Sequence, residues 1–171
     1  MEANTLKELY VDHLRDIYSA ENQITKALPK MAKKAGSEEL KQAFEEHLRQ
    51  TEHQISRLEQ IFGSLEKSPR GKKCVGMEGL IDEGKEIMSE KMEAEVMDAA
   101  LIAAAQKVEH YEIAAYGTVR AYAELLGEQQ AVDLLRQTLD EESAADEKLT
   151  GIAESTINVK ALNGEMMKEA A

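Results

Sequence analysis

The sequence has little of what stabilises small secreted domains or membrane proteins. Cys74 is its one cysteine, so no disulfide can form within the chain, and a reducing compartment is the simpler assumption. Residues 1–21, MEANTLKELYVDHLRDIYSAE, are charged throughout and lack the apolar core of a signal peptide. No apolar run approaches the roughly 18 residues that a membrane helix needs. We therefore expect a cytoplasmic protein without a membrane partner.

Positive charge is also scarce. The chain has 33 acidic residues against 21 lysines and arginines, which gives a formal net charge of −12. A nucleic acid or an anionic membrane would be repelled at long range, and no basic patch is present to overcome this repulsion. We therefore expect no nucleic-acid partner.

The composition that remains is that of a helical domain. The 171 residues are 43% hydrophobic, with no tryptophan, two prolines and abundant Ala, Glu, Leu, Lys and Met. This length supports one sizeable core. We predict a single all-α domain over residues 1–171, with its core at about 5–157 and a polar C-terminal tail.

Apolar residues at steps of three and four predict a first pair of helices. The first begins after Asn4 or Thr5 and ends near Gly36, with a kink or an early end at Pro29. The second begins at Ser37, which we predict to form a capping box. The joint between them is so short that the two helices must form an antiparallel hairpin.

A second hairpin is predicted after a long crossover. Residues 63–77 read as irregular, and a short amphipathic helix is predicted at about 78–90. Asp98 is predicted to cap a long helix that stops at Gly127, and the last helix covers about 131–152 before it frays. The crossover of roughly 35 residues is far longer than most connections between bundle neighbours.

The two hairpins resemble one another. LKQAFEEH at 40–47 and LRQTLDEE at 135–142 match at most positions, which pairs His47 with Glu142. A duplication of the hairpin would give this match and would make Glu21 equivalent to Glu109. Chance agreement between two amphipathic helices is the alternative.

Carboxylates stand where an apolar helix face is expected. In QKVEHYEIAAYG, residues 106–117, Glu109 and Glu112 are flanked on both sides by alanine and aliphatic residues. A buried carboxylate without a partner is costly, so it loses its charge, pairs with a cation or binds a metal.

Each of the four long helices places such a group on its apolar stripe. They are Glu21, His47, Glu109 or Glu112, and Glu142 with Asp146 one turn further on. Carboxylate oxygens with an imidazole favour iron or manganese over metals that prefer thiolates. Taken singly, Glu21 or Asp146 is more simply a charge at the edge of the core, and it is the convergence from four helices that indicates a metal site. His53 and Glu46 fall off the stripe, and His110 points away from it.

Several segments resemble a known family. They are YSAENQITKALPKM, HLRQT, KKCVGMEGLI, DAALIAAAQKVEHYEIAAYGT and EESAADEKL. Together they are similar to the YciF and YciE family of stress-associated bacterial proteins, within the ferritin-like superfamily. The resemblance covers about residues 5–155 and implies a ferritin-like four-helix bundle with a long crossover, a homodimer, and a dinuclear iron site, with manganese as the alternative metal. The residues that this resemblance implies for the metal site are Glu21, His47, Glu109, Glu112, Glu142 and Asp146.

The sequence departs from the usual ferritin-like ligand pattern. Iron proteins of this kind carry Glu-x-x-His on two helices, whereas here Phe44 precedes His47 and Ala145 follows Glu142. His47 with Gln50, and Glu142 with Asp146, would have to substitute. Three functions stay open: a dimetal protein that reacts with oxygen or peroxide, a non-catalytic metal-binding stress protein, and a metal-free interaction bundle.

Overall fold

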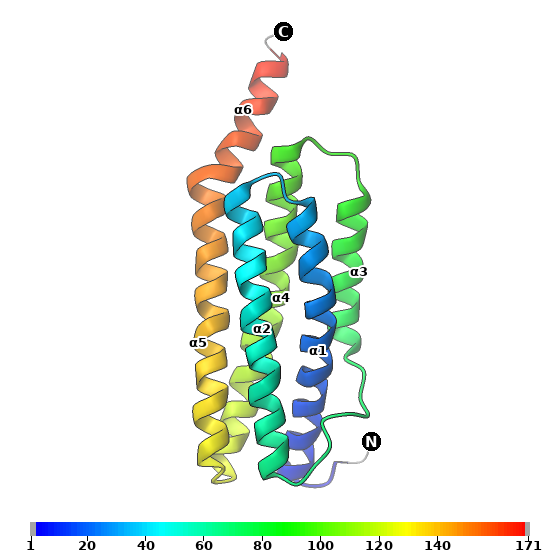
Figure 1. Cartoon of the computed structure of the whole chain (residues 1–171), viewed down its shortest axis with the longest axis vertical. Coiled ribbons are helices and arrows are strands. Elements are labelled where there is room, and N and C mark those ends of the chain that lie inside the picture. The colour runs from blue at the N-terminus through cyan, green and yellow to red at the C-terminus, as the bar shows by residue number, and fades with distance from the viewer. Residues whose placement is uncertain (1–2, 170–171) are drawn as a thin grey trace.

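The computed structural model describes residues 3–169, and side chains within residues 3–164. Its helices are α1 (Leu6–Lys34), α2 (Glu38–Ser64), α3 (Val75–Ser89), α4 (Ala94–Leu125), α5 (Gln129–Ile152), a π-helical turn (Ala153–Ile157) and α6 (Asn158–Glu169). Two antiparallel hairpins, α1–α2 and α4–α5, form a bundle, and α3 lies in the crossover beside α1 and α4 (Figure 1). The predicted fold class is therefore confirmed.

Local sequence signals explain how the first hairpin begins. Thr5 caps α1 in a capping box with Glu8. Ser37 caps α2, since its hydroxyl accepts the backbone N–H of Leu40. The predicted capping box is wrong, because a capping box needs a Glu or Gln at the third helical position, and this position is Leu40. Of the two alternatives predicted at Pro29, a kink or an early end, the early end is wrong, since α1 continues through this residue to Lys34.

The crossover differs from the prediction at the start of α3 and at the start of α4. This helix begins at Val75, three residues early, because the Cys74 thiol accepts the N–H of Met77 as a cap. Asp98 does not cap α4, which starts four residues before it. Its carboxylate accepts instead the N–H groups of Gly36 and Ser37, both at 2.8 Å, so it holds the α1–α2 turn from the other hairpin.

The end of the chain is more regular than predicted. Gly127 ends α4 with a φ of 73°, a left-handed conformation that glycine adopts at little cost. After α5 the chain does not fray at Ile152, because a π-helical turn leads directly into α6. Ile157, in that turn, is still buried in the core. No helix in residues 3–169 is long and apolar enough to cross a membrane.

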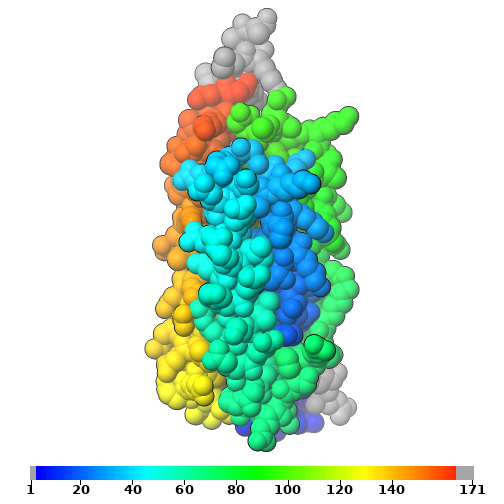
Figure 2. Space-filling view, in the orientation of Figure 1, coloured from blue at the N-terminus to red at the C-terminus, as the bar shows by residue number. Residues whose placement is uncertain are grey.

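The core is divided into two apolar clusters along the bundle axis. One, at the α1–α2 turn and under α3, includes Leu28, Leu40, Phe44, Met77, Leu101 and Ile157. The other, near the start of α1, includes Tyr10, Leu14, Phe62, Tyr116, Val119 and Leu135. Between them every long helix buries polar side chains. In the space-filling view α1 and α2 cover the near face, so this layer is enclosed (Figure 2).

Candidate metal centre

The buried polar layer is built from all four long helices. Its members are Glu21 on α1; His47, Thr51, Gln54 and Arg57 on α2; Glu109 and Glu112 on α4; Thr138 and Glu142 on α5. Glu109 and Glu112 are three residues apart, so both project from the same helix face. The helical periodicity that buries the apolar clusters therefore directs these polar groups to one level of the bundle.

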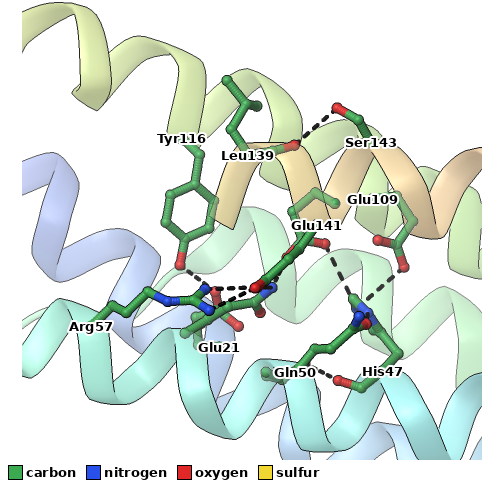
Figure 3. Close-up of polar contacts among 12 residues, drawn as sticks. Glu21, His47, Gln50, Arg57, Glu109, Tyr116, Leu139, Glu141 and Ser143 are labelled. Carbon is green, nitrogen blue, oxygen red and sulfur yellow. Dashed lines mark hydrogen bonds and ion pairs between the residues drawn. The ribbon is translucent and has the colours of Figure 1, made fainter. Parts of the chain in front are cut away.

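Four of the predicted ligands converge closely. His47, Glu109, Glu112 and Glu142 each offer a ligand atom, and these atoms all lie within 4.8 Å of one another. The Nε2 atom of His47 is 3.4 Å from Oε1 of Glu109 and 3.7 Å from Oε2 of Glu142. Glu21 is fully buried and accepts a hydrogen bond from the Tyr116 hydroxyl (Figure 3).

Asp146 lies outside this group of four. Its side chain is 21% exposed, and one carboxylate oxygen accepts a hydrogen bond of 3.0 Å from Gln106. The other oxygen is 3.2 Å from Nε2 of His110, a residue that the sequence placed off the stripe. The assignment of Asp146 as a ligand stays a prediction, and in the structure this residue joins α4 to α5 beside the buried layer.

Burial makes the ionised forms of these carboxylates unfavourable. The pKa of Glu109 and that of Glu112 are raised well above the usual value, first by desolvation and then by neighbouring carboxylates. Desolvation also raises the pKa of Glu21, to which the charge of Glu142 adds. The pKa of the Tyr116 phenol is raised by its own burial and then by Glu21, so the hydroxyl keeps its proton and donates it.

The layer is short of hydrogen-bond donors. Among the described side chains, eight buried polar atoms have no hydrogen-bond partner, and all except the Tyr10 hydroxyl belong to this layer. They are Oε2 of Glu21, Nε2 of His47, Oε1 of Gln54, Oε2 of Glu109, both oxygens of Glu112 and Oε2 of Glu142. Buried polar atoms are normally paired, and most of these seven atoms are carboxylate oxygens, so the layer offers the acceptors that a metal cation would bind.

The donor set fits hard divalent metals. Three converging carboxylates and one imidazole, with the carboxylate of Glu21 in the same buried layer, suit iron or manganese. No thiolate is involved, because the Cys74 sulfur lies 2.9 Å from the Tyr111 hydroxyl in another part of the bundle. The Nδ1 atom of His47 is 3.4 Å from Oε1 of Gln50, which can only accept a hydrogen. The Nδ1–H tautomer that this contact favours leaves Nε2 free to bind a metal.

Two residues that the sequence analysis missed support the carboxylates. Gln54 donates to Glu142 and, at 3.2 Å, to Glu141. Arg57 binds Glu141 through two hydrogen bonds of 2.6 Å and reaches the Thr138 hydroxyl at 3.0 Å (Figure 3). These contacts tie α2 to α5 and fix the orientation of Glu142.

Cavities reach the site from two directions. One of about 250 Å³ lies between α1, α3 and α4, and another of about 210 Å³ lies between α2 and α5. His47 and Glu109 line both. The inner ends of the two cavities therefore meet these two buried residues from different sides of the bundle.

Comparison with known proteins places the chain in a family. The family described as Domain of unknown function (DUF892) matches residues 5–162. Protein YciF from Escherichia coli (strain K12) is 50% identical over 164 residues, which cover 95% of this chain and 99% of that protein.

Solved structures agree. The crystal structure of the E. coli stress protein YciF has a TM-score of 0.88 at 48% identity, covering 91% of this chain and 99% of that one. A protein from Xanthomonas campestris has a TM-score of 0.75 at 25% identity, with 94% and 98% covered. The chain therefore belongs to the DUF892 family, and it is similar over most of its length to the stress protein YciF of E. coli.

Proposed function

We propose that the chain is a stress-response protein that binds two iron ions in the buried polar layer. Manganese is the alternative metal, and the proposed compartment is the cytoplasm. The observation that carries the proposal is the group of seven polar atoms in this layer that lack a hydrogen-bond partner. They come from four helices and are mostly acidic, which is the arrangement that metal sites in helical bundles share.

Charge supports two ions rather than one. Glu21, Glu109, Glu112 and Glu142 carry four negative charges when ionised, and the neutral imidazole of His47 adds none. Two divalent cations balance these charges, whereas a single cation leaves two buried charges uncompensated. Glu109 and Glu112 project from one face of α4, so both carboxylates would hold the ions.

The surrounding residues prepare the layer for oxygen or peroxide chemistry. Bound ions of this kind supply a Lewis acid and, for iron, electrons to an oxidant. Gln54 and Arg57 hold the carboxylates of α5 in place, and the Tyr116 hydroxyl donates a hydrogen bond to Oε1 of Glu21. The two apolar clusters above and below the layer exclude bulk water.

Elemental analysis of protein purified without chelator, and after loading with ferrous or manganous ion, tests the site. We expect about two ions per chain, the nuclearity of carboxylate sites in such bundles. Glu109→Ala or Glu142→Ala should remove most of the metal, whereas His53→Ala, at an exposed position of α2, should leave it. Equal metal content in all three variants would refute the assignment.

Turnover then separates the remaining functions. Consumption of peroxide or oxygen by the loaded protein, lost in Glu109→Ala and kept in His53→Ala, supports a catalytic role. Full metal content without any turnover indicates a non-catalytic metal-binding protein. Absence of metal under every loading condition indicates a metal-free interaction bundle.

A further inference from the structure

The crossover helix α3 closes an apolar cavity against α1 and α4. The cavity measures about 250 Å³, and its walls include Ile24, Leu28, Leu80, Ile81, Met88 and Val108. An apolar cavity of about 150 Å³ is enough to hold a benzene molecule, so this one accepts a longer chain or more than one ring. In Figure 1, α3 runs alongside α1 over this region.

The inner end of the cavity is the candidate metal site. His47 and Glu109 belong to its lining, although both are almost completely buried. Glu109 is the only acidic side chain among the described residues that line the cavity. A molecule that fills this space therefore has apolar walls along its length and ends at the two residues of the polar layer.

The outer rim carries the opposite charge. Lys26, Lys30 and Lys85 line the cavity and are exposed. Lys85 is paired with Asp82 at 2.6 Å, but Lys26 and Lys30, one helical turn apart on α1, form no ion pair with any described residue. On a chain with a net charge of −12, two unpaired ammonium groups beside an apolar cavity favour an anionic head group.

Open space lies next to Gly84 in the wall of this cavity. Gly84 is a buried residue of α3, yet a Cβ atom built there would meet no heavy atom within 4 Å. A buried helical position with nothing to contact is unusual, because interiors are close-packed. The gap faces the cavity that Gly84 lines, which is the room that a ligand chain would occupy.

From these features we infer that the cavity binds an amphipathic organic anion, a single-chain carboxylate whose head group lies at Lys26 and Lys30 and whose apolar tail extends toward His47 and Glu109. The inference deepens the proposed function by naming the class of molecule that reaches the metal site. Its link to metal chemistry rests on that proposed function, whereas the binding itself needs no metal and is tested without it.

Calorimetric titration of the metal-free protein with decanoate tests the inference, with decanol and decyltrimethylammonium as ligands of the same chain length and different charge. Decanoate should bind most tightly. Gly84→Leu, which fills the open space, should reduce its affinity at least tenfold, while Gly79→Leu on the exposed face of the same helix should leave the affinity unchanged. The double variant Lys26→Gln, Lys30→Gln should weaken decanoate about fivefold, as expected for exposed charges, and leave decanol unaffected.

Three outcomes would overturn the inference. They are the absence of decanoate binding, equal affinity for the anionic and cationic ligands, and equal losses in Gly84→Leu and Gly79→Leu. Melting curves of both leucine variants establish that each is folded. The lysine double variant changes exposed side chains only, so its affinity for decanoate tests the head-group site without altering the packing of the core.

Metal content of the same variants separates this inference from the proposed function. Decanoate binding to a protein that never takes up metal upholds the ligand site and refutes the metal site. Normal metal content without decanoate binding upholds the metal site and refutes the ligand site.

Discussion

Glu112→Gln is the substitution that tests most directly whether the buried carboxylates of the polar layer are metal ligands. Glu112 is 1% exposed and neither of its oxygens has a hydrogen-bond partner among the described residues. Its pKa is raised by burial and then by the charges of Glu21 and Glu142. Each unit by which a folded pKa exceeds the unfolded one costs about 1.4 kcal/mol of stability once the pH is above both. Glutamine keeps the shape, removes the charge and adds N–H donors for neighbouring oxygens that lack them.

The effect in metal-free protein has a defined pH dependence. Below the unfolded pKa of about 4.3, glutamate is protonated in both states and the variant gains little. As pH rises through the raised folded pKa, wild type loses stability relative to Glu112→Gln, and the difference then stays constant. Relief of this penalty should raise Tm by several degrees, since each 1 kcal/mol corresponds to roughly 2–4 °C in a domain of this size.

Metal should reverse the sign. Manganese binds the ionised carboxylates and stabilises the folded state by mass action, so losing one ligand lowers Tm in the loaded protein. The assay is thermal unfolding followed by circular dichroism, with and without manganous ion. Glu52→Gln, at an exposed position of α2 that forms no ion pair with any described residue, is the matched control and should give a small change of the same sign in both conditions. The same behaviour in Glu112→Gln would refute the reasoning.

Other predictions concern the scaffold. Asp98→Ala removes the acceptor of two backbone N–H groups in the α1–α2 turn and should cost about 1–2 kcal/mol in chemical unfolding, as the loss of a helix cap does; an unchanged midpoint would contradict this. Gly79→Ala should stabilise α3 by about 0.5–1 kcal/mol, and a lower Tm would mean that this face is packed. Cys74→Ser keeps an oxygen acceptor for the N–H of Met77, so metal content and assembly should not change in elemental analysis and light scattering. We also propose a two-fold homodimer, which light scattering showing a monomer at micromolar concentration would disprove.

The long helices were predictable because their apolar residues follow the helical period over many turns. The start of α3 was predicted three residues late because cysteine is not among the preferred capping residues, although the Cys74 thiol does accept the N–H of Met77. The role of Asp98 could not be read locally, because its partners lie 62 and 61 residues away in the sequence.

The site was predictable in part for the same reason. Glu21, Glu109 and Glu142 interrupt apolar stripes, and the structure buries all three. Gln54 and Arg57 were missed because the apolar Ile55, next to Gln54, is the residue that composition alone would turn inward, whereas Ile55 is only half-buried and Gln54 is fully buried. A shift of one residue rotates a helix position by 100°, which exchanges inward and outward faces. The spacing from His47 through Thr51 to Gln54 is helical and would have identified the glutamine.

The contact between Asp98 and the α1–α2 turn also affects the order in which the chain can fold during synthesis. All residues of the first hairpin are synthesised before Asp98, whose carboxylate holds the α1–α2 turn and lies 62 residues after Gly36 in the sequence. Until Asp98 is synthesised, the N–H groups of Gly36 and Ser37 depend on water. A nascent chain that stops before Asp98 therefore carries an incomplete hairpin, and two fragments separated in the crossover should regain full helicity only when they are mixed.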